Sequence, residues 1–143
     1  MPDIFHQFIV LADAEKVFDA VSRAEGLDSW WTKSSADNPV AGGIYRLYFG
    51  PEYDWEAIVT DYQPPSIFEL QIRCADIEWN GTRIGFRLTK LDGKTGVDFY
   101  HAGWPSASDH YKISSYCWAM YLRILKRYVE YRERVPYEKR LDV

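Results

Sequence analysis

The sequence predicts an α+β fold, in which a curved antiparallel β-sheet of about six strands grips a long C-terminal α-helix, with two short helices after the first strand. Three observations lead to this prediction. Short segments that alternate apolar and polar residues, separated by turn residues, occupy the middle of the chain. Apolar residues at helical spacing follow the first segment and recur near the end. The sheet must bury its apolar face, and only the last helix is large enough to cover it.

The first elements are a strand and two short helices. Residues 4–11 (IFHQFIVL) are mostly β-branched and aromatic, as expected of a strand. Asp13 is the expected N-cap of a helix with an apolar stripe at Ala14, Val17, Phe18 and Val21. We expect Gly26 to separate this helix from a second one that carries Leu27, Trp30 and Trp31.

A loop over residues 32–43, marked by Asn38-Pro39 and Gly42-Gly43, is expected before five further strands. The segments that predict these strands are GIYRLYFG, WEAIVTDY, IFELQIRC, TRIGFRLTKL and TGVDFYHAG. The Asp92-Gly93 pair predicts a hairpin turn between the last two. Short strands joined by turns in this way indicate an antiparallel meander.

The longest helix is expected to start near Ser106, with Asp109 three residues later, and to run to about Tyr131. One of its faces is formed by residues at steps of four and three, namely Tyr111, Ser115, Trp118, Leu122, Leu125 and Val129. Glutamates alternate with the basic residues of this region, so we expect a solvated face rather than an anion site. These basic residues are Arg123, Lys126, Arg127, Arg132, Arg134, Lys139 and Arg140.

Composition narrows the functional classes. A length of 143 residues suits one domain spanning residues 1–143, and the net charge of -4 without a basic cluster argues against nucleic-acid binding. No stretch approaches the ~20 apolar residues of a membrane span, and the N-terminus lacks a basic leader, so we expect a cytoplasmic protein. Cys74 and Cys117 are isolated, which fits reduced thiols and leaves a disulfide open.

Several segments, taken in order, resemble the START-like superfamily, also called SRPBCC, helix-grip or Bet v 1-like. They are IVLADAEKVFDAVSRAEGLDSWW, GGIYRLYFG, IVTDYQPPSIFEL and TGVDFYHAG, together with the segment from Trp118 to Leu125. The most similar branch is that of the C-terminal domain of the activator of heat shock protein 90 ATPase. The resemblance spans Ile4 to about Val129 and implies a hydrophobic cavity between the sheet and the long helix. Superfamily members bind lipids, hormones and polyketides, and some are cyclases or hydrolases.

The chain departs from this pattern at three places. Cys117-Trp118 stands where the family often has Gly-Trp, the GPEYD loop is short, and GWPSASD is an unusual lead-in to the last helix. These departures bear on the identity of the ligand more than on the fold.

Strand alternation and helical spacing select the residues that would line such a cavity. The predicted ligand-binding residues are Trp30, Trp31, Tyr45, Leu47, Phe49, Phe86, Phe99, His101, Tyr111, Ser115, Trp118 and Leu122. Adjacent helical residues point about 100° apart, so we expect one of the tandem tryptophans in the core and the other facing the cavity or its rim. The alternative is that these bulky side chains meet and leave no void.

The sequence does not identify a catalytic residue. His101 lies on the apolar face of its strand, where it would orient a polar ligand group, act as a base, or serve as a hydrogen-bonded core histidine. Nothing brings His6 and His110 to it, so we expect neither a metal nor a cofactor. Ser108-Asp109-His110 are consecutive and cannot adopt triad geometry. The sequence leaves open whether Arg73 and Glu78 form a salt bridge or a ligand clamp.

The leading hypothesis is therefore a module that binds a hydrophobic or aromatic small molecule, without a required enzymatic activity. The alternatives are a polyketide cyclase-like or hydrolase-like enzyme and a domain that contacts the heat shock protein 90 chaperone. The sequence also leaves open a homodimer through a strand edge.

Overall fold

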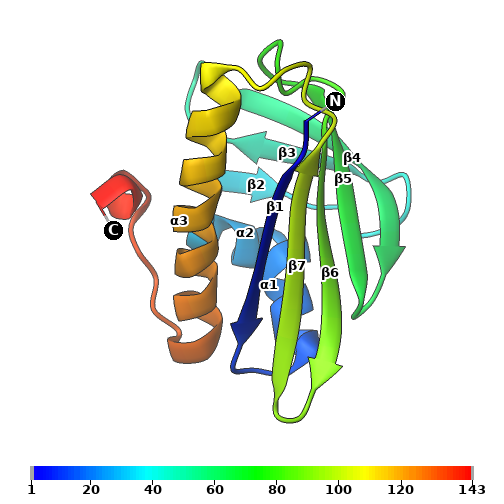
Figure 1. Ribbon diagram of the computed structural model, residues 1–143, viewed down its shortest axis with the longest axis vertical. Helices are drawn as coiled ribbons and strands as arrows, with labels where there is room; N and C mark the ends of the chain where they lie inside the picture. Colours follow the sequence, from blue (N-terminus) through cyan, green and yellow to red (C-terminus); the bar gives the residue numbers. More distant parts are fainter. Residues whose placement is uncertain (1, 143) are drawn as a thin grey trace.

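Seven antiparallel strands and one long helix organise the structure, a computed structural model that describes residues 2–142 (Figure 1). The strands are β1 (Ile4–Val10), β2 (Ser34–Ala36), β3 (Ile44–Tyr48), β4 (Asp54–Gln63), β5 (Ile67–Cys74), β6 (Arg83–Leu91) and β7 (Lys94–Ala102). The helices are α1 (Ala14–Ser22), α2 (Ala24–Trp30), α3 (Asp109–Tyr131) and the 3₁₀ helix η1 (Tyr137–Asp142). The sheet order is β1-β7-β6-β5-β4-β3-β2, which confirms the predicted α+β architecture.

The inner face of the sheet follows the predicted alternation. On β3, β6 and β7 the apolar residues of one parity are buried, and they pack with α1, α2 and α3 into one core. These residues are Tyr45, Leu47, Ile84, Phe86, Leu88, Val97 and Phe99. Burying that face behind the helices removes it from water, which is the main stabilising contribution in such a fold.

Two predicted features near the N-terminus were wrong. The loop over residues 32–43 contains a seventh strand, β2, which pairs with β3 through Ser35 and Leu47 and has no apolar alternation to reveal it. The break between α1 and α2 falls at Arg23, and Gly26 lies inside α2. A Cβ atom on Gly26 would come within 2.5 Å of the Ala20 Cα atom, so this glycine allows the two helices to pack closely.

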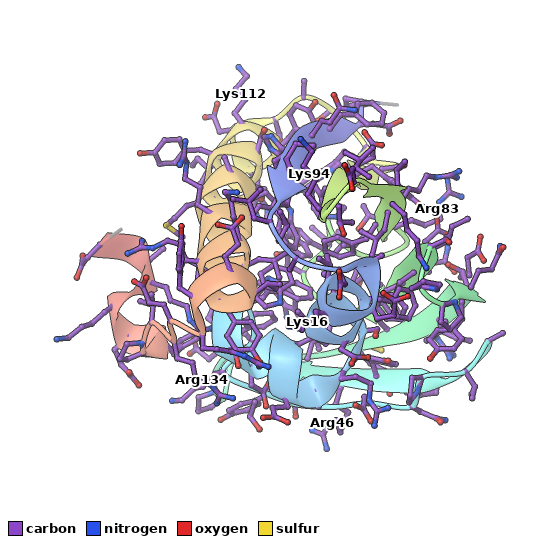
Figure 2. The ribbon with its side chains drawn as sticks, turned by 90° about the horizontal axis from the view of Figure 1, so that it is seen from below. Lys16, Arg46, Arg83, Lys94, Lys112 and Arg134 are labelled. Atoms are coloured by element: carbon purple, nitrogen blue, oxygen red, sulfur yellow. The ribbon has the colours of Figure 1, made fainter. Side chains whose placement is uncertain are left out.

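The N-cap of helix α3 also lies two residues later than we expected. Its N-cap is Ser108, whose Oγ accepts a hydrogen bond from the Tyr111 backbone N–H at 3.2 Å, so Ser106 is not the cap. The buried face is rotated slightly from the predicted one, with Ser114 buried in place of Ser115. Lys112 and five other basic side chains that Figure 2 labels lie on different sides of the molecule rather than in one patch.

The chain after α3 forms a segment that we call the C-terminal strap (residues 132–142). It returns along the ends of α2 and β3, where Arg140 is only 3% exposed, so the prediction that Arg140 belongs to a solvated face was wrong. Its guanidinium donates to the backbone carbonyls of Val135, Thr32 and Asp28 at 3.0, 3.0 and 2.6 Å. These carbonyls replace water as hydrogen-bond acceptors, which makes burial of the charged group tolerable. Within residues 2–142, no helix combines the length and apolar character needed to cross a membrane.

Candidate functional site

A cavity of about 290 Å³ opens between α3, the end of α2, the strand ends of β3 and β4, and the C-terminal strap. We call it the aromatic pocket. Its lining residues are Trp31, Phe49, Tyr53, Trp55, Trp79, His110, Ile113, Ser114, Cys117, Trp118, Tyr121 and Tyr137. Among the described residues, no lysine, arginine, aspartate or glutamate lines it.

Five of these rings contact one another in a closed circuit. The ring centroids are 5.4 Å apart for Trp31 and Phe49, 5.2 Å for Phe49 and Trp55, and 4.9 Å for Trp55 and Trp79. Trp118 completes the circuit, at 6.1 Å from Trp79 and 5.1 Å from Trp31. Because each ring is supported by two others, the circuit forms a preorganised wall rather than a set of independent side chains.

The tandem tryptophans are both buried and their rings stack with centroids 6.0 Å apart, but only one of them borders the cavity. Trp30 is fully buried, and its Nε1–H donates to the Ala20 carbonyl at 2.9 Å, which fastens α2 to α1. Trp31 follows the last residue of α2 and lines the aromatic pocket. The two rings therefore combine an anchoring role with a position in the pocket wall.

The pocket has few polar groups. Burial raises the pKa of Tyr121 to about 12, and it also raises the pKa of the Cys117 thiol. A thiol with a raised pKa is mostly protonated and is a poor nucleophile. Ser114, which the sequence analysis missed in favour of Ser115, contributes a hydroxyl-bearing residue to the wall.

His101 lies behind this wall in a hydrogen-bonded chain. The Trp118 Nε1–H donates to His101 Nδ1 at 3.0 Å, and His101 Nε2 is 2.8 Å from Thr82 Oγ1. Because an indole N–H can only donate, Nδ1 is the acceptor and the proton resides on Nε2. The Thr82 hydroxyl then donates to the Trp79 carbonyl. Both ring nitrogens are thus engaged, which favours the core-histidine interpretation over a catalytic base.

The His101 imidazole is held neutral. Burial, with a smaller contribution from the charge of His110, lowers the pKa of His101 from 6.5 to about 3. The unfolded chain therefore takes up a proton as pH falls below about 6.5, whereas the folded chain resists it. The contribution of neutral His101 to the free energy of unfolding is fully present above pH 6.5. At lower pH it declines by roughly 1.4 kcal/mol per pH unit.

We expect His101→Gln to weaken this pH dependence, because glutamine does not titrate. Between pH 6.5 and 5 the wild type should lose about 2 kcal/mol more than the variant, measured as the free energy of unfolding in urea. His6→Gln is the matched control and should leave the wild-type slope intact. Equal slopes for wild type and His101→Gln would contradict a buried neutral histidine.

A polar cluster lies at one rim of the aromatic pocket. Glu78 accepts hydrogen bonds from the Ser108 hydroxyl at 2.7 Å and from His110 Nδ1 at 2.9 Å. His110 Nε2 is 3.7 Å from Asp76 Oδ2. Among the described residues, Arg73 does not form an ion pair with Glu78. The cluster fastens the loop between β5 and β6 to the first turn of α3.

Three of the twelve residues predicted to bind a ligand line the aromatic pocket: Trp31, Phe49 and Trp118. Seven others are buried in the core, and these are Trp30, Tyr45, Leu47, Phe86, Phe99, His101 and Leu122. The remaining two face the N-terminal strand. The Tyr111 hydroxyl donates to the Asp3 carbonyl at 2.8 Å, and the Ser115 carbonyl accepts from His6 Nε2 at 3.3 Å. Aromatic bulk fills the centre between sheet and helix, so the open space lies at its end.

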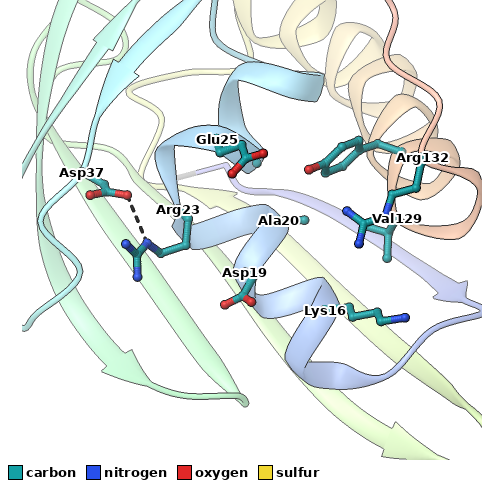
Figure 3. A pocket seen from close by; sticks show the side chains of 10 residues that line it. Lys16, Asp19, Ala20, Arg23, Glu25, Asp37, Val129 and Arg132 are labelled. Carbon is teal, nitrogen blue, oxygen red and sulfur yellow. Dashed lines mark hydrogen bonds and ion pairs between the residues drawn. The ribbon is translucent and has the colours of Figure 1, made fainter.

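A second cavity, of about 380 Å³, separates α1 and α2 from the end of α3 (Figure 3). Charged side chains of both signs surround it. Arg23 pairs with Asp37 at 3.2 Å, and Glu25 pairs with Arg134 at 3.2 Å. This charged cleft has a more polar lining than the aromatic pocket, whereas a small-molecule site is normally lined by apolar side chains. Among residues 2–142, His, Cys, Asp and Glu side chains do not gather into a group that could hold a metal ion.

Comparisons with known proteins agree with this architecture. The family model of activator of Hsp90 ATPase homolog 1-like proteins matches residues 11–130. The solution structure of the Aha1 dimer from Colwellia psychrerythraea is 28% identical, with a TM-score of 0.82 over 92% of this chain and 98% of that one. A solution structure of a Bacillus halodurans protein is 23% identical, with a TM-score of 0.76 over 91% and 98% of the two chains. CalU16 from Micromonospora echinospora is 15% identical, with a TM-score of 0.72 over 98% and 83%. No curated protein matches the chain in sequence.

Proposed function

Because the chain belongs to the family of activator of Hsp90 ATPase homolog 1-like proteins, a branch of the helix-grip superfamily, we propose that it binds a small apolar or aromatic molecule in the aromatic pocket. The observation that supports this proposal best is the closed circuit of Trp31, Phe49, Trp55, Trp79 and Trp118 around an open cavity. Trp31, Trp79 and Trp118 are 3%, 7% and 2% exposed and form the buried back of the pocket, whereas Phe49 and Trp55 are partly exposed and would gain contact area when a flat apolar molecule enters.

The size of the cavity limits the ligand. Pockets for drug-sized molecules have volumes of about 300–1,000 Å³. At about 290 Å³, the aromatic pocket suits a molecule of one or two rings rather than a long lipid or a large polyketide. Trp31, Phe49 and Trp118 are proposed as direct contacts, together with Trp55 and Trp79, which the sequence analysis did not include.

Native mass spectrometry of the purified protein tests this proposal first, because a retained molecule would reveal its mass and the oligomeric state together. Aromatic compounds of one or two rings can then be titrated while tryptophan fluorescence is recorded. We expect Trp55→Leu to weaken binding about tenfold, equivalent to ~1.4 kcal/mol of lost stacking and contact. Tyr116→Leu, which changes an 80% exposed ring on α3, should leave affinity unchanged. Saturable binding that is indifferent to Trp55→Leu would place the site elsewhere.

Dimerisation and enzymatic activity stay secondary proposals. The Colwellia relative is a dimer, and the native mass spectrum reports whether this chain forms one too. The hydrogen bonds at both nitrogens of His101 do not favour a base at that position. A cyclase or hydrolase would need another base.

A further inference from the structure

We propose that the preferred ligand of the aromatic pocket is a small organic cation, with a substituted ammonium group carried on an apolar body. This inference rests on the proposed function and specifies the chemistry of its ligand. It follows from two observations: the kind of surface that encloses the cavity and the sign of the charges at its rim.

The circuit around the cavity consists of four tryptophans and one phenylalanine. An aromatic face carries negative electrostatic potential, and tryptophan attracts cations most strongly of the three aromatic side chains. All five rings belong to the lining of the cavity, and a site lined by several aromatic rings is of the kind that recognises quaternary ammonium groups. Neighbouring planes are tilted by angles between 25° and 61°, so the rings do not form one flat platform.

The charges near the cavity add to this preference. Because lysine and arginine are missing from the lining formed by the described residues, no ammonium or guanidinium there would repel a cation. Asp76 and Glu78 flank His110, which itself lines the pocket. Two carboxylates outweigh one imidazole, so this rim is negative whether or not His110 carries a proton.

Two positive features define how the cation would lie. The first turn of α3 places the positive end of a helix dipole beside the carboxylates, but this amounts to only about half a charge. Arg140 lies on the side of the strap, stacked over Tyr137 at 5.4 Å and hydrogen-bonded to three carbonyls. The ammonium group would therefore point toward Glu78 and Asp76, with the apolar body toward Tyr137.

The carboxylates also have a simpler role, since Glu78 holds Ser108 and His110 at the start of α3. That role stabilises the helix and would not distinguish a charged ligand from a neutral one of the same shape. A pair of matched probes separates the two interpretations.

The test compares phenyltrimethylammonium with tert-butylbenzene. The two molecules have the same shape, but the first has a positively charged nitrogen where the second has a neutral carbon. Binding is followed by tryptophan fluorescence and confirmed by isothermal titration calorimetry. We expect the cation to bind at least tenfold more tightly. Equal or tighter binding of tert-butylbenzene would overturn the cation proposal and leave the proposed function standing. Failure of phenyltrimethylammonium to bind at millimolar concentration, together with failure of tert-butylbenzene to bind up to its solubility limit, would overturn both.

Substitutions test whether the carboxylate of Glu78 causes the preference for the cation. Glu78→Gln preserves shape and should weaken binding of phenyltrimethylammonium at least threefold while leaving tert-butylbenzene unaffected. Asp61→Asn removes a carboxylate six residues along β4 from Trp55 and serves as the charge-matched control with no expected effect. An equal response of both probes to Glu78→Gln would mean that the carboxylate only shapes the pocket, and would count against the proposal.

Discussion

Replacing Trp118 with alanine is expected to lower the free energy of unfolding by about 3–5 kcal/mol, the usual range for removing a buried tryptophan. The ring is 2% exposed and contacts Trp31, Phe99 and Trp79, with centroid distances of 5.1, 4.6 and 6.1 Å. The substitution would leave a cavity beside these rings. It would also leave His101 Nδ1 without its donor, and an unpaired buried acceptor carries a further cost.

Urea unfolding at pH 7 measures this loss. The matched control is Tyr116→Ala, which removes an aromatic side chain from the same helix at a position that is 80% exposed. We expect the control to change stability by less than about 0.5 kcal/mol. Similar losses for the two variants would mean that Trp118 does not support the wall.

Arg140→Ala is expected to release the C-terminal strap. The substitution removes hydrogen bonds to the carbonyls of Val135, Thr32 and Asp28 at once. Bonds that involve a charged group contribute about 1.5–3 kcal/mol each, although desolvation of the guanidinium offsets part of the sum. We therefore expect the strap to open at least tenfold more often and the Tyr137 wall of the pocket to loosen.

Limited proteolysis with chymotrypsin measures strap opening as the rate of cleavage after Tyr137, because cleavage of a transiently open segment follows its population. Lys139→Ala changes the neighbouring exposed residue and should not alter the rate. Arg140→Lys should resemble alanine, since lysine lacks the fork that reaches several carbonyls together. Unchanged cleavage in Arg140→Ala would show that the strap is held by other contacts.

Much of the fold could be predicted from local pattern. Alternation on β3, β6 and β7 identifies the inner face because side chains of a strand point to opposite sides of the sheet. The errors in the predicted fold occur where the sequence has no apolar alternation. Strand β2 is three residues long with an exposed, polar sequence, and its position depends on pairing with β3 rather than on its own side chains.

The pocket was harder to predict, because a void depends on how far bulky side chains fill the space between elements. Alternation identifies residues such as Phe99 that face the centre, but aromatic packing closes the centre. Trp55 and Trp79 come from a strand start and from a loop, where periodicity gives little information. Tyr137 and Arg140 lie beyond the last predicted helix, and nothing in the sequence brings them back to α2 and β3.

The aromatic pocket takes its walls from two parts of the chain, one inside the segment that matches the family and one in the C-terminal strap. All five rings of the circuit lie within residues 11–130, the part that matches the family, and its tryptophans also support the core. Tyr137 lies outside that part, and its hydroxyl donates to the Phe49 carbonyl at 3.2 Å. A substitution at Tyr137 would therefore change one wall of the pocket without removing any ring of the circuit.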